Sequence, residues 1–153
     1  MSEDDWVDIA GRMADDARGK FHRLPVRVYF EDTDAGGVVY HASYVRFCER
    51  GRTDFLRLLG VEARQLISGE ASNEPAAFVV RRMSLEFLRP ARMDDLLVIE
   101  TRVKDLGGAS VTLTQEISND GRKVFEAEVI VVLVSVAGKP LRLSDAIRVA
   151  FEA

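Results

Sequence analysis

The sequence predicts an α+β domain in which an antiparallel five-stranded sheet wraps around one long buried helix. Apolar residues recur at helical spacing between Tyr44 and Leu59. From residue 76 onward the pattern changes to strands joined by short turns. The last of these becomes apolar on both faces between Val129 and Val134, which indicates a central strand covered by helix on one side.

The long helix is expected over residues 44–59. Its apolar side chains follow a period of about 3.6 residues, and most of the charged side chains fall off that stripe. Gly51 lies on the buried stripe, where the missing side chain lets a sheet approach closely. Gly60 is a natural end for the helix.

Five strands and two short helical segments complete the prediction. Pro25 can begin the first strand, because the first residue of a strand tolerates a missing N–H. Asp120-Gly121 is a strong hairpin signal between the last two strands. Residues 61–68 can add a helical turn, and Ser144 can cap a final helix within the ambiguous segment 141–153. The strands are expected over residues 24–30, 76–88, 96–106, 109–119 and 122–136.

Residues 1–23 are expected to form an N-terminal extension, with the domain itself spanning residues 24–153. One interpretation of the extension is a short amphipathic helix, and the alternative is a frayed acidic tail. A helix on a membrane surface is disfavoured, because the aspartates of this stretch would repel anionic lipid. The apolar residues at helical spacing are Trp6, Ile9, Ala10, Met13 and Ala17.

Length, charge and cysteine content limit the class of protein. A chain of 153 residues is most simply one domain, and its net charge of −4 argues against a general affinity for nucleic acid. A single cysteine excludes an internal disulfide framework and fits a reducing cytoplasm. The chain has no apolar run long enough to span a membrane, and it starts with acidic residues where a signal peptide is basic. We therefore expect a cytoplasmic protein.

The stretch 29–41 joins the first strand to the long helix and is the candidate reaction centre. It is an acidic turn with two glycines that leads into the helix. A helix N-terminus carries unpaired amides and partial positive charge, so it can bind developing negative charge. We therefore expect Asp34 and these amides to form the reaction centre.

The run from Val26 to Tyr44 resembles the signature of the hotdog-fold acyl-CoA thioesterases. Within them it is similar to the 4-hydroxybenzoyl-CoA thioesterase-like group, and there to the thioesterase associated with the Tol-Pal envelope system. The resemblance continues through residues 47–52, 77–81 and 90–95. It implies a hotdog fold, hydrolysis of an acyl-CoA without metal or redox cofactor, and a homodimer or homotetramer.

The resemblance also implies roles for individual residues. Asp34 matches the family's catalytic carboxylate, which would act as general base or as nucleophile. The backbone N–H of His41, with that of Tyr40 as the less favoured donor, would bind the thioester oxygen, and the His41 imidazole would help place water or substrate. Taken without the resemblance, Asp34 is an aspartate that bonds its own turn. Asp32 is expected to orient that turn.

Metal sites fit the same residues poorly. A calcium loop starting at Asp32 needs a glutamate at its twelfth position, where Ser43 stands. His22 and His41 have no paired cysteines and make no zinc site.

Two residues of the long helix have ordinary structural interpretations. Cys48 is expected to be a small buried hydrophobe. Glu49 is expected to pair with Arg46, Arg50 or Arg52.

Phe30 departs from the family pattern, because close relatives often carry Tyr there, and any role for that hydroxyl is lost. For the phosphates of coenzyme A, the candidates are Arg82, Arg89 and Arg92, which flank the sheet edge near Pro90.

The alternative to an enzyme is a non-catalytic hotdog module that binds acyl carrier protein or an envelope-complex partner. The absence of a tyrosine hydroxyl at Phe30 and the acidic N-terminus both allow this non-catalytic interpretation. A dehydratase on the same fold would need a His-x-Phe-Pro-Gly motif, which the chain lacks.

Overall fold

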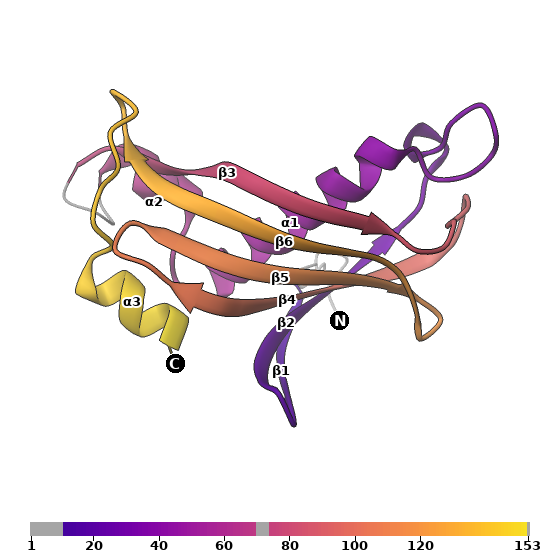
Figure 1. Cartoon of the computed structure of the whole chain (residues 1–153), viewed down its shortest axis with the longest axis horizontal. Helices are drawn as coiled ribbons and strands as arrows, with labels where there is room; N and C mark the ends of the chain where they lie inside the picture. Colours follow the sequence, from indigo (N-terminus) through magenta and orange to yellow (C-terminus); the bar gives the residue numbers. More distant parts are fainter. Residues whose placement is uncertain (1–10, 70–73, 153) are drawn as a thin grey trace, which may run out of the picture.

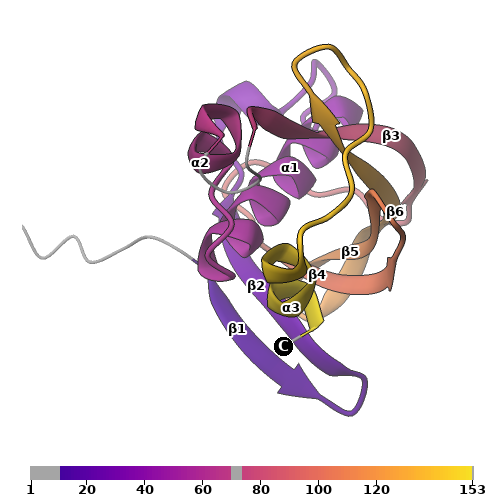
Figure 2. The ribbon, with the colours of Figure 1, turned by 90° about the vertical axis from the view of Figure 1, so that its left-hand side faces the viewer.

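A computed structural model describes residues 11–69 and 74–152 of the chain. Its centre is α1 (His41–Leu58), around which an antiparallel sheet curves (Figures 1 and 2). The sheet runs in the order β1-β2-β4-β5-β6-β3, so β1 and β3 form its edges. The strands are β1 (Arg12–Asp16), β2 (Gly19–Arg27), β3 (Ala76–Phe87), β4 (Leu96–Leu106), β5 (Ser110–Asn119) and β6 (Arg122–Ser135).

The shorter helices cover the end of the sheet where α1 finishes. The helix α2 (Ala63–Ser68) contacts β3, and α3 (Asp145–Glu152) brings Phe151 against Phe55 of α1 and Phe78 of β3. Ser144 caps α3, since its hydroxyl accepts the Ile147 N–H at 3.2 Å. The expected short helix, final helix and cap are confirmed. No helix in the described part of the chain is both long and apolar enough to cross a membrane.

The predicted α+β hotdog arrangement is confirmed, but the sheet among the described residues has six strands and not five. The sixth is β1, which pairs with β2 as a hairpin. A helix or frayed tail over residues 12–23 is therefore wrong, and this part of the expected extension belongs to the same sheet. Trp6, Ile9 and Ala10 lie outside the described residues.

The hairpin forms because its turn and its side chains suit extended structure. Gly19 has a φ of 104°, and the Asp16 carboxylate accepts the Arg18 N–H at 2.8 Å. Phe21 is buried, and the Arg102 guanidinium lies 4.1 Å from the centre of its ring. The helix prediction rested on five apolar residues, which are too few to distinguish helical spacing from strand alternation. This explains why it was wrong.

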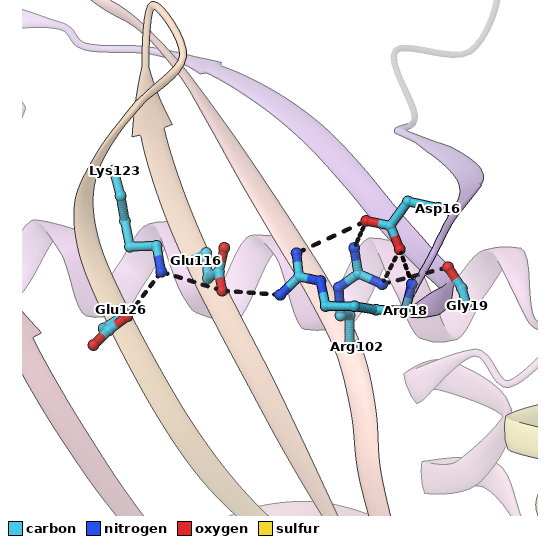
Figure 3. A network of polar contacts seen from close by, with 7 residues as sticks. All are labelled: Asp16, Arg18, Gly19, Arg102, Glu116, Lys123 and Glu126. Atoms are coloured by element: carbon cyan, nitrogen blue, oxygen red, sulfur yellow. Dashed lines mark hydrogen bonds and ion pairs between the residues drawn. The ribbon is translucent and has the colours of Figure 1, made fainter.

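A network of ion pairs on the outer face of the sheet links this hairpin to the central strands (Figure 3). Asp16 pairs with Arg102, and Arg18 reaches Glu116 of β5 at 3.5 Å. Lys123 continues the network to Glu116 and to Glu126 of β6, at 3.4 and 3.0 Å. The hydrogen bond from Arg102 is the main cause that lowers the pKa of Asp16.

The strand predicted over residues 24–30 is β2, which begins earlier, at Gly19, and ends earlier, at Arg27. The Asp32 carboxylate accepts the Tyr29 N–H at 2.8 Å, and this bond bends residues 30–32 into a 3₁₀ turn, η1 (Phe30–Asp32). Asp32 thus orients the turn, as expected. The helix α1 begins three residues before the predicted residue 44.

Gly51 lets α1 lie close to the sheet, as its place on the apolar stripe predicts. A Cβ atom there would lie 2.9 Å from Ile99 Cγ2 and 3.2 Å from Gln115 Nε2. Gln115 is fully buried, and its Nε2 donates to the Cys48 carbonyl and to Thr101 Oγ1, both at 2.9 Å. A strand side chain therefore fastens the helix backbone to the sheet.

His22 and Asp54 form a buried pair between β2 and α1. His22 Nε2 lies 2.6 Å from Asp54 Oδ2, which also accepts the Gly11 N–H at 2.7 Å, while Arg57 donates to Asp54 Oδ1 at 3.2 Å. The other ring nitrogen, Nδ1, has no partner among the described residues. Burial lowers the pKa of His22, although Asp54 opposes the shift. The folded protein therefore holds this imidazole neutral over a wider pH range than the unfolded chain does.

This pair predicts a pH dependence of stability. Below a pH of about 6.5 the unfolded chain binds a proton at His22 that the folded protein resists, so the free energy of unfolding falls as the pH falls. His22→Gln keeps an amide donor for Asp54 but removes the titration. Urea unfolding between pH 5 and 8 should show a flatter profile for the variant, by up to about 1.4 kcal/mol per pH unit. Parallel profiles for the two proteins would contradict the assignment.

Candidate active site

The turn between η1 and α1 is held by its own backbone. The Asp34 N–H donates to the Val38 carbonyl at 2.8 Å, Thr33 bridges to Val39, and Gly37 takes a φ of 83°. Asp34 Oδ1 accepts the Gly36 N–H at 2.8 Å and faces the Val38 N–H at 3.4 Å. The second carboxylate oxygen, Oδ2, has no donor among the described residues. Asp34 therefore both organises its turn and keeps one oxygen for other chemistry.

A neighbouring loop fixes the direction in which the turn enters α1. The Val39 N–H donates to the Ala91 carbonyl at 2.8 Å, and Val38 bridges to Arg92. The Tyr40 N–H donates to the Asp32 carbonyl at 2.8 Å, so it is already engaged. His41 is the first residue of α1, where backbone N–H groups lack intrahelical acceptors. Of the two expected oxyanion donors, the geometry favours His41.

Asp34 and His41 line one open pocket of about 360 Å³. Its other walls come from Tyr44 of α1 and from the end of β3, where Phe87 is half exposed. The Tyr44 hydroxyl accepts the Ala91 N–H at 3.2 Å, and its ring stacks on Phe125 at 5.1 Å. A carboxylate, a helix start and an apolar wall thus meet in one place.

A larger hollow of about 530 Å³ lies between β2 and α1, and it does not include Asp34. Charged side chains such as Arg27, Glu31, Arg50 and Arg57 line much of it. Size alone therefore does not single out the candidate site, since Asp34 and the first residue of α1 together line the smaller pocket.

The sequence matches the family described as the thioesterase superfamily over residues 36–126, more than half of the chain. The chain belongs to the thioesterase superfamily. The acyl-CoA thioester hydrolase YbgC of Escherichia coli is 48% identical over 132 residues, which are 85% of this chain and 95% of the relative. The acyl-CoA thioesterase YbgC of Haemophilus influenzae is 39% identical over 129 residues, 84% of this chain and 92% of the relative.

A solved structure of similar fold is the probable thioesterase of Bartonella henselae. It superposes with a TM-score of 0.79 at 45% identity, and the match covers 81% of this chain and 99% of that one. The identification of a hotdog thioester hydrolase from the sequence is thereby confirmed.

The three arginines proposed for coenzyme A lie at different distances from the pocket of this thioesterase. Arg89 lines the pocket with Asp34, and its guanidinium donates to the Lys123 carbonyl at 3.3 Å. Arg92 lies on the loop that bridges to Val38. Arg82 lies at the bulge of β3, outside the pocket. All three are exposed, and only Arg89 meets the candidate reaction centre.

Other predictions for single residues have mixed outcomes. Cys48 is fully buried, and burial raises the pKa of its thiol to about 12, as expected for a structural cysteine. The prediction of an ion pair for Glu49 is wrong. Its carboxylate accepts a hydrogen bond from the Thr53 hydroxyl at 2.8 Å instead. Phe30 is 80% exposed on η1 and does not line the Asp34 pocket.

Sequence reasoning missed Tyr44 and Phe87 as pocket residues: it assigned Tyr44 to the apolar stripe of the helix and included Phe87 only in the strand over residues 76–88. A signal for Tyr44 was present, because it lies three residues after His41 and therefore on the same face of α1. Phe87 carried no such signal, since it reaches the site only through the pairing of β3 with β6.

Proposed function

We propose that this thioesterase hydrolyses acyl-CoA to the free acid and coenzyme A, with Asp34 as the catalytic carboxylate. The names of the YbgC relatives support the substrate class. The observation that carries the assignment of the residue is the shared pocket, in which Asp34 and the first turn of α1 face the same space. A thioester carbonyl held there meets a carboxylate on one side and a helix N-terminus on the other.

The reaction adds water to the carbonyl carbon and breaks the carbon–sulfur bond. Asp34 Oδ2 either takes a proton from the attacking water or attacks the carbonyl itself. In the second case the thiolate leaves as a mixed anhydride forms, and water then hydrolyses the anhydride to the free acid, restores the Asp34 carboxylate and supplies the proton. The His41 N–H stabilises the negative oxygen of the tetrahedral intermediate, and such a donor is typically worth about 10²–10³ in rate. The His41 imidazole, 6.4 Å from the Phe87 ring, helps to place water or substrate. The leaving thiolate takes up the proton.

Asp34→Asn tests the carboxylate. The Asn side-chain oxygen can still accept the Gly36 N–H, so the turn should persist while the proton acceptor is lost. We expect kcat to fall by roughly 10²-fold or more, with an unchanged unfolding midpoint. Release of free coenzyme A from a panel of acyl-CoAs, followed with a thiol reagent, measures the effect.

Asp94→Asn is the matched control, because Asp94 is an exposed aspartate with a φ of 72°, which Asn also tolerates. Its kcat should equal that of the unmodified protein. An Asp34→Asn protein that hydrolyses acyl-CoA at the unmodified rate would remove Asp34 from the mechanism.

Arg89 is the best placed of the three arginines to hold a coenzyme A phosphate. Arg89→Ala should raise KM for acyl-CoA roughly tenfold and leave kcat nearly unchanged, since the contact is equal in ground and transition states. Acyl-pantetheine lacks the nucleotide, so its KM should not respond. Arg82→Ala is the control outside the pocket. An equal rise in KM for both substrates would show that Arg89 does not hold a phosphate.

A homodimer or homotetramer is part of the proposal. Within residues 11–69 and 74–152, the edge strand β3 pairs on one side only, with β6, and it exposes Val79, Val80 and Phe87. Exposed apolar edges of this kind suit pairing with a second copy. Multi-angle light scattering should give twice or four times the mass of the chain, and a monomer at micromolar concentration would contradict the proposal.

The non-catalytic alternative, a module that binds acyl carrier protein or an envelope-complex partner, predicts no turnover that depends on acyl length. The same acyl-CoA panel separates the two hypotheses. A cytoplasmic location, acyl carrier protein as a partner and a link to the Tol-Pal system stay predictions.

A further inference from the structure

A further cavity lies along the second half of α1, away from the Asp34 pocket. It has a volume of about 260 Å³ and opens between α1, α2 and the start of β3. It shares no lining residue with the Asp34 pocket. Its walls are mostly apolar, and they include Leu56, Leu66, Phe78, Leu113 and Val131.

One cation, Arg52, lines this apolar cavity. The residue is only 9% exposed, and it forms no ion pair with a carboxylate in the described ranges. Its Nη1 donates to Gln115 Oε1 at 3.1 Å. A guanidinium has five N–H donors, so most of its hydrogen-bonding capacity is left for another partner.

Gln115 fixes the orientation of this guanidinium. Both bonds from Gln115 Nε2, to the Cys48 carbonyl and to Thr101 Oγ1, hold the amide so that its oxygen points to Arg52. Arg52 is therefore anchored at one edge by a group that is itself locked in the core. A pre-oriented guanidinium loses little side-chain entropy when it binds a ligand.

The charge of Arg52 is poorly compensated. Burial lowers its pKa, although Cys48 and Glu49 oppose the shift. Glu49 also lines the cavity, but its carboxylate is exposed and accepts the Thr53 hydroxyl. Although Arg52 is only 9% exposed, those of its nitrogens that form no hydrogen bond with the described residues are not fully buried, so they keep access to the open cavity. A cation that has lost much of its hydration is stabilised by pairing, which an anion in the cavity would provide.

We propose that this cavity binds a short aliphatic carboxylate, whose charged end pairs with Arg52 while its chain contacts the apolar walls. Arginine and carboxylate suit each other, since the fork of N–H groups matches two carboxylate oxygens. The cavity has room for about nine groups of the size of a water, at roughly 30 Å³ each. Hexanoate, with eight non-hydrogen atoms, fits that space. Acids of this class are the products of the proposed hydrolysis, and only this link depends on the proposed function.

Calorimetric titration of the full-length protein with sodium hexanoate tests the proposal. Hexan-1-ol has the same chain without the charge, and hexylammonium has the opposite charge. We expect hexanoate to bind at least about tenfold more tightly than hexan-1-ol, because the alcohol cannot form the charged hydrogen bond with Arg52. Hexylammonium should not bind. Equal binding of the acid and the alcohol would overturn the proposal.

Variants locate the binding. Arg52→Gln should abolish the preference for the acid, and its unfolding midpoint in urea shows whether it remains folded. Ala77→Met leaves Arg52 intact and fills the cavity from β3, so it should weaken hexanoate binding even if Arg52→Gln fails to fold. Asp34→Asn should bind hexanoate like the unmodified protein. A folded Arg52→Gln protein that still prefers the acid, or loss of binding in Asp34→Asn, would overturn the assignment.

Discussion

The depth at which α1 lies in the sheet is the constraint on which the rest of this structure depends. Gly51 sets that depth, since any larger residue would meet Ile99 and Gln115. The amide of Gln115 then ties the helix backbone to the sheet at the Cys48 carbonyl. The helix held at this depth carries Tyr44, whose hydroxyl accepts the Ala91 N–H, and both Tyr44 and His41 line the Asp34 pocket.

The geometry of Asp34 shows that two interpretations of an aspartate in a glycine turn are compatible. Oδ1 bonds the Gly36 N–H, as an aspartate in a turn ordinarily does. The same bond limits the rotation of the carboxylate of Asp34, which lines the pocket. An aspartate that stabilises its own turn can therefore also serve in the role proposed for it, because the local bond provides the preorganisation that a reactive group needs.

The sequence alone predicted the features whose physical cause lies in neighbouring residues. The period of α1, the Asp120-Gly121 turn with both φ angles positive, and the Ser144 cap each depend on neighbouring residues. The first hairpin was missed because five residues cannot separate two periodicities. Tyr44 bonds Ala91, and Arg52 bonds Gln115, across separations of 47 and 63 residues. Contacts of this kind depend on the register of the sheet, which no local pattern contains.

The hairpin of β1 and β2 contacts the rest of the molecule through two different kinds of polar interaction. At one end the Gly11 amide and His22 bond the buried Asp54. At the other end Asp16 and Arg18 take part in the exposed network that Figure 3 shows. Mobile ions screen exposed charges over about 10 Å at ordinary ionic strength and affect buried pairs much less. Added salt therefore loosens the tip of the hairpin and leaves its base in place, so fraying of this sheet edge proceeds from the tip.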